Sequence, residues 1–120
     1  MLNMAQFETA YYATLTEVTD PCGKDREEEW RKRHFGYGLL ILFKSEYKMP
    51  GKTFVCFYKE APGELIPPYF RTSPGEQKIQ GNNLFLTTRN SCYTFRLEQL
   101  IPESKQKKIK DIYREYFILH

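Results

Sequence analysis

The sequence contains few of the residue types on which metal and redox sites depend. It has only three cysteines, Cys22, Cys56 and Cys92, which are widely spaced and form no CxxC pair. An odd number of scattered cysteines is not typical of a secreted disulfide scaffold, and nothing in their spacing indicates zinc binding or redox chemistry. We therefore predict no metal and no cofactor. Cys56 and Cys92 lie in apolar, strand-like runs, so we expect both to be buried free thiols.

The sequence also lacks the common catalytic motifs, with no HExxH, GxSxG, GxGxxG or phosphate-binding loop. Histidine is the most frequent general acid or base, and the chain has only two. His34 ends a charged stretch, where a solvated side chain is the favoured interpretation, and His120 is the last residue. We assign no catalytic residue. A small basic hydrolase such as a ribonuclease is the third hypothesis, and it requires five side chains to meet on one face of a sheet: Tyr69, Arg71, Arg89, Tyr93 and Arg96.

Long hydrophobic runs and a strong charge of one sign are missing as well. The longest apolar run, residues 38–43, is far shorter than the roughly 20 residues that a membrane-spanning helix needs. The first residues show no apolar segment behind a basic start, so no signal peptide is predicted. We expect a cytoplasmic protein without membrane contact. The net charge of +3 permits nucleic-acid binding but does not indicate it.

What the sequence does contain is aromatic and apolar material. Of its 120 residues, 41% are hydrophobic and 16% aromatic, including nine Phe and nine Tyr. This is enough for one modest core, and we predict a single domain. Tyrosine buries its ring but needs a partner or water for its hydroxyl, so nine tyrosines predict many half-buried positions.

Residues 1–20 have two interpretations. An Asn3–Gln6 capping box and apolar residues three or four apart are typical of a helix. Those apolar residues are Met4, Phe7, Tyr11, Leu15 and Val18. The alternation in residues 11–16, with threonines on one side, favours a strand instead. We predict an N-terminal helix over 1–20, which Pro21 ends because the residue before a proline avoids the helical region. Residues 21–35 follow as a charged connector, either a short exposed helix anchored by Trp30 or a mobile insertion.

The middle of the chain, residues 36–100, is predicted to be an antiparallel β-meander. Residues 37–43 and 53–59 are apolar on both faces of an extended chain and form a hairpin, with Pro50 and Gly51 in a type II turn. Residues 65–71 are predicted as an edge strand because Pro67 and Pro68 cannot donate ladder hydrogen bonds. Residues 84–89 and 92–99 give further strands, the last with clean alternation. We expect an α+β fold of five to six strands, either a twisted sheet or a partly open small barrel.

A helix over residues 102–119 is predicted to close the chain. Its apolar stripe consists of Ile109, Ile112, Tyr113, Tyr116 and Phe117. Most of its lysines lie away from that stripe, which we expect to cover the sheet or a barrel mouth. In the order of its elements the chain resembles the pleckstrin-homology-type architecture, or a small SH3-like or OB-like barrel with an added helix. The resemblance concerns the fold alone.

The leading functional hypothesis is a non-catalytic small intracellular binding or adaptor protein, with a protein partner or self-association. The candidate partner-binding residues are Trp30, Tyr47, Tyr58, Tyr69 and Arg71. The alternative is a nucleic-acid-binding accessory protein that uses basic residues beside aromatic rings. Its candidate residues are Lys44, Lys48, Lys59, Lys107 and Lys108.

Overall fold

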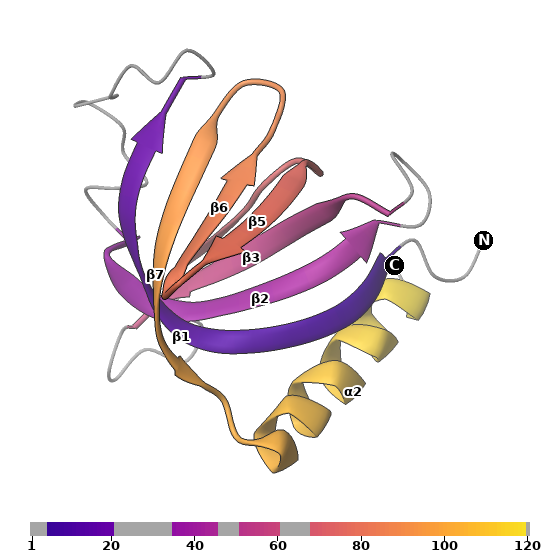
Figure 1. The fold of residues 1–120 in the computed structure, drawn as a ribbon. Helices are drawn as coiled ribbons and strands as arrows, with labels where there is room; N and C mark the ends of the chain where they lie inside the picture. Colours follow the sequence, from indigo (N-terminus) through magenta and orange to yellow (C-terminus); the bar gives the residue numbers. More distant parts are fainter. Residues whose placement is uncertain (1–4, 21–34, 46–50, 61–67, 120) are drawn as a thin grey trace.

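The computed structural model describes residues 5–20, 35–45, 51–60 and 68–119 of the chain, with side chains described from Gln6 to Asp111. Within the described residues, seven strands precede one long helix. Figure 1 shows this helix at the C-terminal end of the chain. The strands are β1 (Ala5–Thr19), β2 (Tyr37–Ser45), β3 (Thr53–Lys59), β4 (Tyr69–Arg71), β5 (Glu76–Gln80), β6 (Asn83–Thr87) and β7 (Cys92–Leu100), and the helix is α2 (Glu103–Leu119). The fold is therefore mostly antiparallel sheet with a C-terminal helix. Residues 37–100 form six strands, within the predicted five to six, and β1 adds a seventh strand to the sheet.

The predicted N-terminal helix is wrong, because residues 5–19 form the strand β1. Part of the apparent helical spacing comes from irregularities in this strand, whereas Tyr11 and Leu15 share the inner face by ordinary alternation and Phe7 packs against the outer cluster. The register of β1 shifts between Phe7 and Thr9 and again between Leu15 and Glu17. A β-bulge inserts an extra residue and so interrupts the two-residue alternation. Leu15 and Val18 therefore both face the inner core although they are three positions apart.

All neighbouring strands in the sheet are antiparallel, in the order β4-β3-β2-β1-β7-β6-β5. The N-terminal strand β1 lies in the middle of this order. It pairs with β2 from Ala5 to Thr14 and with β7 from Tyr11 to Thr19. The arrangement is thus two hairpin-connected groups of strands joined through β1, and not the continuous meander that was expected.

A separate bridge draws the two ends of the sheet together. Thr53, at the start of β3, exchanges two backbone hydrogen bonds of 3.0 and 2.8 Å with Gly75, which directly precedes β5. On its other side, Gly75 lies so close to Thr87 of β6 that a Cβ atom would be 2.2 Å from the Thr87 carbonyl oxygen. Glycine is required where two backbones approach this closely. The sheet accordingly curls toward a barrel, as its strong curvature in Figure 1 shows.

The curled sheet has two hydrophobic clusters, one on each face. The inner cluster consists of Ala13, Leu15, Val18, Phe35, Leu40, Leu42, Val55, Phe57, Phe70, Leu84, Leu86, Tyr93 and Phe95. The outer cluster consists of Ala10, Ile41, Phe43, Phe54, Cys56 and Ile101. Since β2 and β3 contribute to both clusters, the prediction that these strands are apolar on both faces is confirmed. The alternation predicted for β7 is also confirmed, since Tyr93 and Phe95 are buried while Arg96 is exposed.

The helix α2 begins after Pro102, as predicted, and lies beside the first half of β1 (Figure 1). Its Gln106 side chain occupies the edge of β1 at the point where β7 leaves that strand. The Gln106 Oε1 atom accepts hydrogen bonds from the Ala10 amide (3.2 Å) and the Thr9 hydroxyl (3.1 Å), and Nε2 donates to the Ile101 carbonyl (2.9 Å). The side-chain amide thereby replaces a neighbouring strand, because it satisfies a backbone donor that would otherwise lack a partner.

Replacing Gly38 with alanine is expected to destabilise the protein strongly. A Cβ atom at this position would lie 1.9 Å from the Tyr58 carbonyl oxygen of the neighbouring strand. We expect a loss of about 3 kcal/mol in the free energy of unfolding, measured by urea denaturation. Gly81→Ala is the control, since Gly81 has open space around it but a φ of +61°, and there we expect about 1 kcal/mol. Equal losses in the two variants would contradict the close approach at Gly38.

Replacing Gln106 with methionine should expose the edge of β1 while preserving side-chain length. The Ala10 amide would lose its acceptor, so we expect a loss of about 1 to 2 kcal/mol in stability. Hydrogen exchange at the Ala10 amide should also become faster. Lys107→Met is the matched control, because Lys107 is the next residue in α2 and is exposed. Unchanged exchange at Ala10 in the Gln106 variant would show that the side chain does not protect this edge.

Candidate binding face

A row of large side chains crosses the outer surface of the sheet from β1 to β4. The register places Tyr12 of β1 opposite Leu39 of β2, Leu39 opposite Tyr58 of β3, and Tyr58 opposite Tyr69 of β4. Residues directly opposite one another in antiparallel strands project from the same face. We call this row, together with Tyr37, the tyrosine face.

The rings of the tyrosine face are stacked in pairs. Tyr58 and Tyr69 have ring centroids 4.9 Å apart with an interplanar angle of 22°, and Tyr12 and Tyr37 have centroids 6.3 Å apart at 17°. Tyr37 and Tyr69 are 40% and 50% exposed, respectively. Contacts between neighbouring rings restrict their rotation, so the face presents aromatic surface in a largely fixed arrangement.

The neighbouring row of the same outer surface is buried and forms the border of the tyrosine face. Two residues along each strand from Tyr12, Leu39 and Tyr58, this row consists of Ala10, Ile41 and Cys56, which lie opposite one another in the outer cluster. Arg71 of β4 continues this row opposite Cys56 but is exposed. Its guanidinium carbon lies 5.9 Å from the centroid of the Phe54 ring, within the range of a cation–π contact. The buried part of the outer surface thus ends next to the tyrosine face.

Charged residues surround Tyr37 at the margin of this face. Loss of hydration raises the pKa of the Tyr37 hydroxyl above its ordinary value, and the charges of Glu60, Tyr12 and Glu98 raise it further. The Glu98 carboxylate accepts a hydrogen bond from the Thr14 hydroxyl and forms an ion pair with Arg96. Like any neutral tyrosine, Tyr37 can act as a hydrogen-bond donor at this margin.

Three of the five predicted partner-binding residues come together on this surface. Tyr58 lies opposite Tyr69, and Arg71 lies two positions after Tyr69 on the same side of β4. Trp30 and Tyr47 lie outside the described residues. Sequence reasoning missed Tyr12 because residues 1–20 were predicted as a helix. The alternation in residues 11–16 was the signal that would have placed Tyr12 on a strand face.

The predicted nucleic-acid-binding lysines are distributed over separate parts of the structure. Lys44 lies at one end of β2, 3.6 Å from a Glu8 carboxylate oxygen. Lys59 lies opposite Gly38, six residues away along that strand, which corresponds to about 20 Å. Lys107 and Lys108 are exposed on α2, and Lys48 lies outside the described residues. The candidate lysines that the structure describes therefore lie on three separate elements, β2, β3 and α2.

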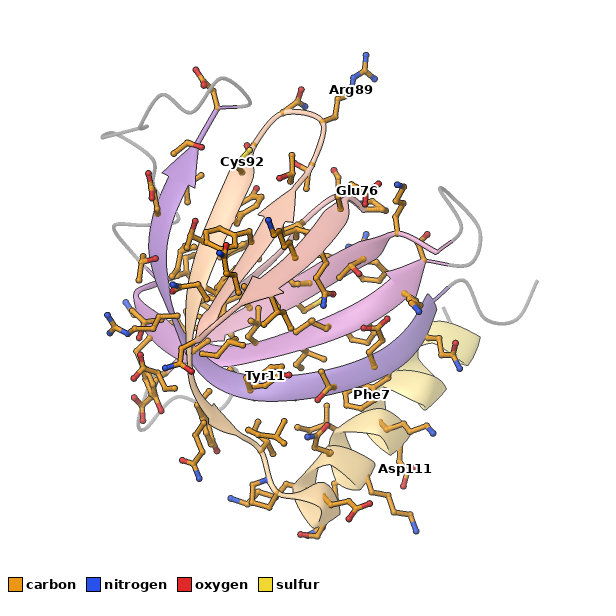
Figure 2. The ribbon with its side chains drawn as sticks, viewed as in Figure 1. Phe7, Tyr11, Glu76, Arg89, Cys92 and Asp111 are labelled. Carbon is orange, nitrogen blue, oxygen red and sulfur yellow. The ribbon has the colours of Figure 1, made fainter. Side chains whose placement is uncertain are left out.

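The five residues considered for a hydrolase do not meet on one face. Tyr93 is buried in the inner cluster, and Arg96 is exposed on the outer surface of β7. Figure 2 shows Arg89 at the end of the β6–β7 loop, pointing away from the sheet. Tyr69 and Arg71 lie on β4, at one end of the strand order. The described part of the chain contains no group of three or more His, Cys, Asp or Glu side chains that would hold a metal ion, and His34 and His120 fall outside that part.

Two open hollows lie elsewhere on the surface. One, of about 720 Å³, lies between Phe7 and α2, where Figure 2 shows the Phe7 side chain directed toward the helix. The other, of about 400 Å³, lies where β2 ends and β3 and β5 begin. Its lysines, Lys44 and Lys52, are already paired with Glu8 and Glu76. Neither hollow brings together a set of groups suited to catalysis.

The cysteines differ in burial. Cys56 is buried, as predicted, whereas Cys92 is only partly buried, and both are free thiols. Burial raises the pKa of the Cys56 thiol to about 12, and the positive charge of Arg71 offsets part of this effect. The thiol therefore remains protonated and unreactive while the protein is folded.

Comparison of the chain with protein-family models, with curated proteins and with solved structures gave no match. Among the described residues, no helix has both the length and the apolar character required to cross a membrane.

The protection of Cys56 can be measured in a Cys22→Ser/Cys92→Ser variant, which retains only this thiol. At pH 8 we expect Cys56 to react with Ellman's reagent only as fast as the protein unfolds, and urea should accelerate the reaction.

The pKa of the Cys56 thiol is higher in the folded protein than in the unfolded chain, so the contribution of this thiol to stability is constant below about pH 9. This contribution to the free energy of unfolding should decline as the pH rises from 9 toward 12. In the Cys56→Ala variant, the part of the decline that comes from this thiol should be absent. Reaction of Cys56 in native protein as fast as a free thiol would contradict its burial.

Proposed function

We propose that this chain is a non-catalytic binding protein that contacts a protein partner through the tyrosine face. The observation that carries the proposal is the strand register, which places four tyrosines and Leu39 side by side on one partly exposed surface. Tyrosine and arginine are enriched at protein–protein interfaces and at the residues that dominate binding energy. The tyrosine face supplies the tyrosines, and Arg71 at its margin supplies an arginine.

The arrangement of the rings also favours binding. Ordering a side chain at an interface costs entropy, and rings that are already held in place lose less. The stacked pairs Tyr58–Tyr69 and Tyr12–Tyr37 are held in this way in the free protein. Polar groups at the margin, including Glu60 and Lys59, resemble the polar rim of typical interfaces.

We propose an intracellular setting for this binding protein. Its support is that the thiols of Cys56 and Cys92 are free, as is usual in reducing compartments. For the fold, we propose the pleckstrin-homology-type architecture in preference to an OB-like barrel. Seven strands followed by a helix exceed the five strands of an OB-fold. This choice does not by itself assign a function.

The proposal can be tested by quantitative affinity capture from an extract of the cells that produce the protein. The test variant is Tyr37→Ser/Tyr69→Ser, which changes the two most exposed rings of the face. We expect the protein that wild type captures specifically to be depleted at least tenfold, corresponding to about 1.4 kcal/mol of binding energy.

The matched control is Ile79→Ser on β5, since Ile79 is 46% exposed, similar to Tyr37 and Tyr69. This variant should capture the partner as wild type does. Sedimentation at increasing protein concentration tests the second option, self-association. If wild type self-associates through this face, its mass should rise with concentration, and that rise should be absent in the Tyr37→Ser/Tyr69→Ser variant. Identical capture and identical mass for all three proteins would refute a binding role for the tyrosine face.

A further inference from the structure

The backbone of β4 has hydrogen-bonding groups available on one side. Along an antiparallel pair, the peptide groups of alternate residues point toward the partner strand. The Lys59 amide donates to the Pro68 carbonyl and the Thr72 amide donates to the Val55 carbonyl. The peptide groups of residues 68, 70 and 72 therefore face β3, and those of Tyr69 and Arg71 face away from it.

No strand covers that outward side, since β4 is the edge of the sheet in the described part of the chain. Tyr69 and Arg71 each offer one N–H and one C=O group there. Their side chains are both exposed and project from the same outer face as the tyrosine face. An incoming strand would thus meet four backbone groups and two large side chains two residues apart.

The charge at this edge is positive. Among the described residues no carboxylate lies within ion-pairing distance of Arg71, whose guanidinium instead lies over the Phe54 ring. By contrast, the described ion pairs already engage Lys44, Lys52 and Arg96 with glutamates. The exposed Arg71 guanidinium is therefore available to a carboxylate from outside, and in a bidentate pair such a contact is specific.

We propose that β4 receives an extended peptide segment of the partner as an additional antiparallel strand. Such strand addition obtains affinity from backbone hydrogen bonds and specificity from alternate side chains. Directly opposite residues share a face, so an acidic residue lies opposite Arg71 and an aromatic residue lies opposite Tyr69. Read from its N-terminus, the antiparallel segment has the pattern acidic–any–aromatic.

The peptide is a better match to this edge than a second copy of the chain. In an antiparallel pair of two β4 strands, Arg71 of each would lie opposite Tyr69 of the other, and neither guanidinium would gain a carboxylate. This inference rests on the proposed function and specifies the chemistry of the partner.

The test uses the full chain, labelled with ¹⁵N, and the synthetic peptide Thr-Thr-Glu-Val-Tyr-Thr-Thr with blocked ends. We expect titration to shift the amide resonances of Tyr69 and Arg71 downfield and to slow their hydrogen exchange. The Arg71→Glu variant should bind this peptide at least fivefold more weakly. The same variant should bind the peptide with Lys in place of Glu at least fivefold more tightly than wild type does. Arg89→Glu, an exposed arginine at a distant loop (Figure 2), is the control and should bind as wild type does.

Each of the following outcomes would overturn the inference that a peptide adds to β4. Peptide shifts on the tyrosine face without the changes at the Tyr69 and Arg71 amides would exclude strand addition. A peptide methylated on the Glu and Tyr backbone nitrogens that binds as well as the parent would exclude it too. A dimer that Arg71→Glu dissociates would make a second copy the occupant. If affinity capture still depends on Tyr37 and Tyr69 while the peptide fails, the proposed function stands and this inference falls.

Discussion

The structure depends on the pairing of one strand, β1, with neighbours on both sides. Its fifteen residues connect the β2–β3–β4 group to the β7–β6–β5 group. Residues 11–14 pair with both neighbours at once, and bulges before and after them allow β1 to bend from one group into the other. The N-terminal part of β1 lacks β7, and the Gln106 side chain of α2 satisfies the Ala10 amide there. Together with Ile109, which packs against the outer cluster, this contact attaches the helix to the sheet beside β1.

The same arrangement determines where a binding surface can form. The outer faces of β2 and β3 are apolar, and the row through Ala10, Ile41 and Cys56 is fully covered. The adjacent row on the outer surface is only partly covered, and it contains Tyr12, Leu39, Tyr58 and Tyr69. Tyrosine suits this position because its ring packs against the sheet while its hydroxyl reaches water. The tyrosine face is therefore the margin of the outer core, held in place by the core itself.

Local patterns in the sequence predicted the parts of the fold that have local causes. The apolar character of β2 and β3 on both faces, the alternation in β7 and the start of α2 after Pro102 each follow from neighbouring residues. Gly51 has a φ of 82°, the positive value that the predicted type II turn requires at its third position. Pro50, the other central residue of that predicted turn, lies outside the described residues. A bulge contributed to the wrong prediction for β1, because it places the inward-facing Leu15 and Val18 three positions apart, as on a helix.

The candidate site was only partly predictable, because it depends on pairing between distant segments. Tyr58, Tyr69 and Arg71 were selected for residue type, but only the register shows that they are adjacent, and Tyr12 joins them only once β1 is a strand. The separation of Lys44 from Lys59 likewise requires the register of β2 with β3. The approach of Gly75 to both Thr53 and Thr87 depends on closure of the sheet, for which the sequence has no local signal.

The most direct test of this account is a nuclear Overhauser spectrum of the labelled protein in solution, combined with the backbone chemical shifts of residues 5–19. The account predicts strand-type shifts throughout, with contacts from Tyr12 to Leu39 on one side and to Gln99 on the other. Helix-type shifts in this segment, or contacts from Tyr12 to only one of these neighbours, would contradict the central position of β1 and the tyrosine face built on it.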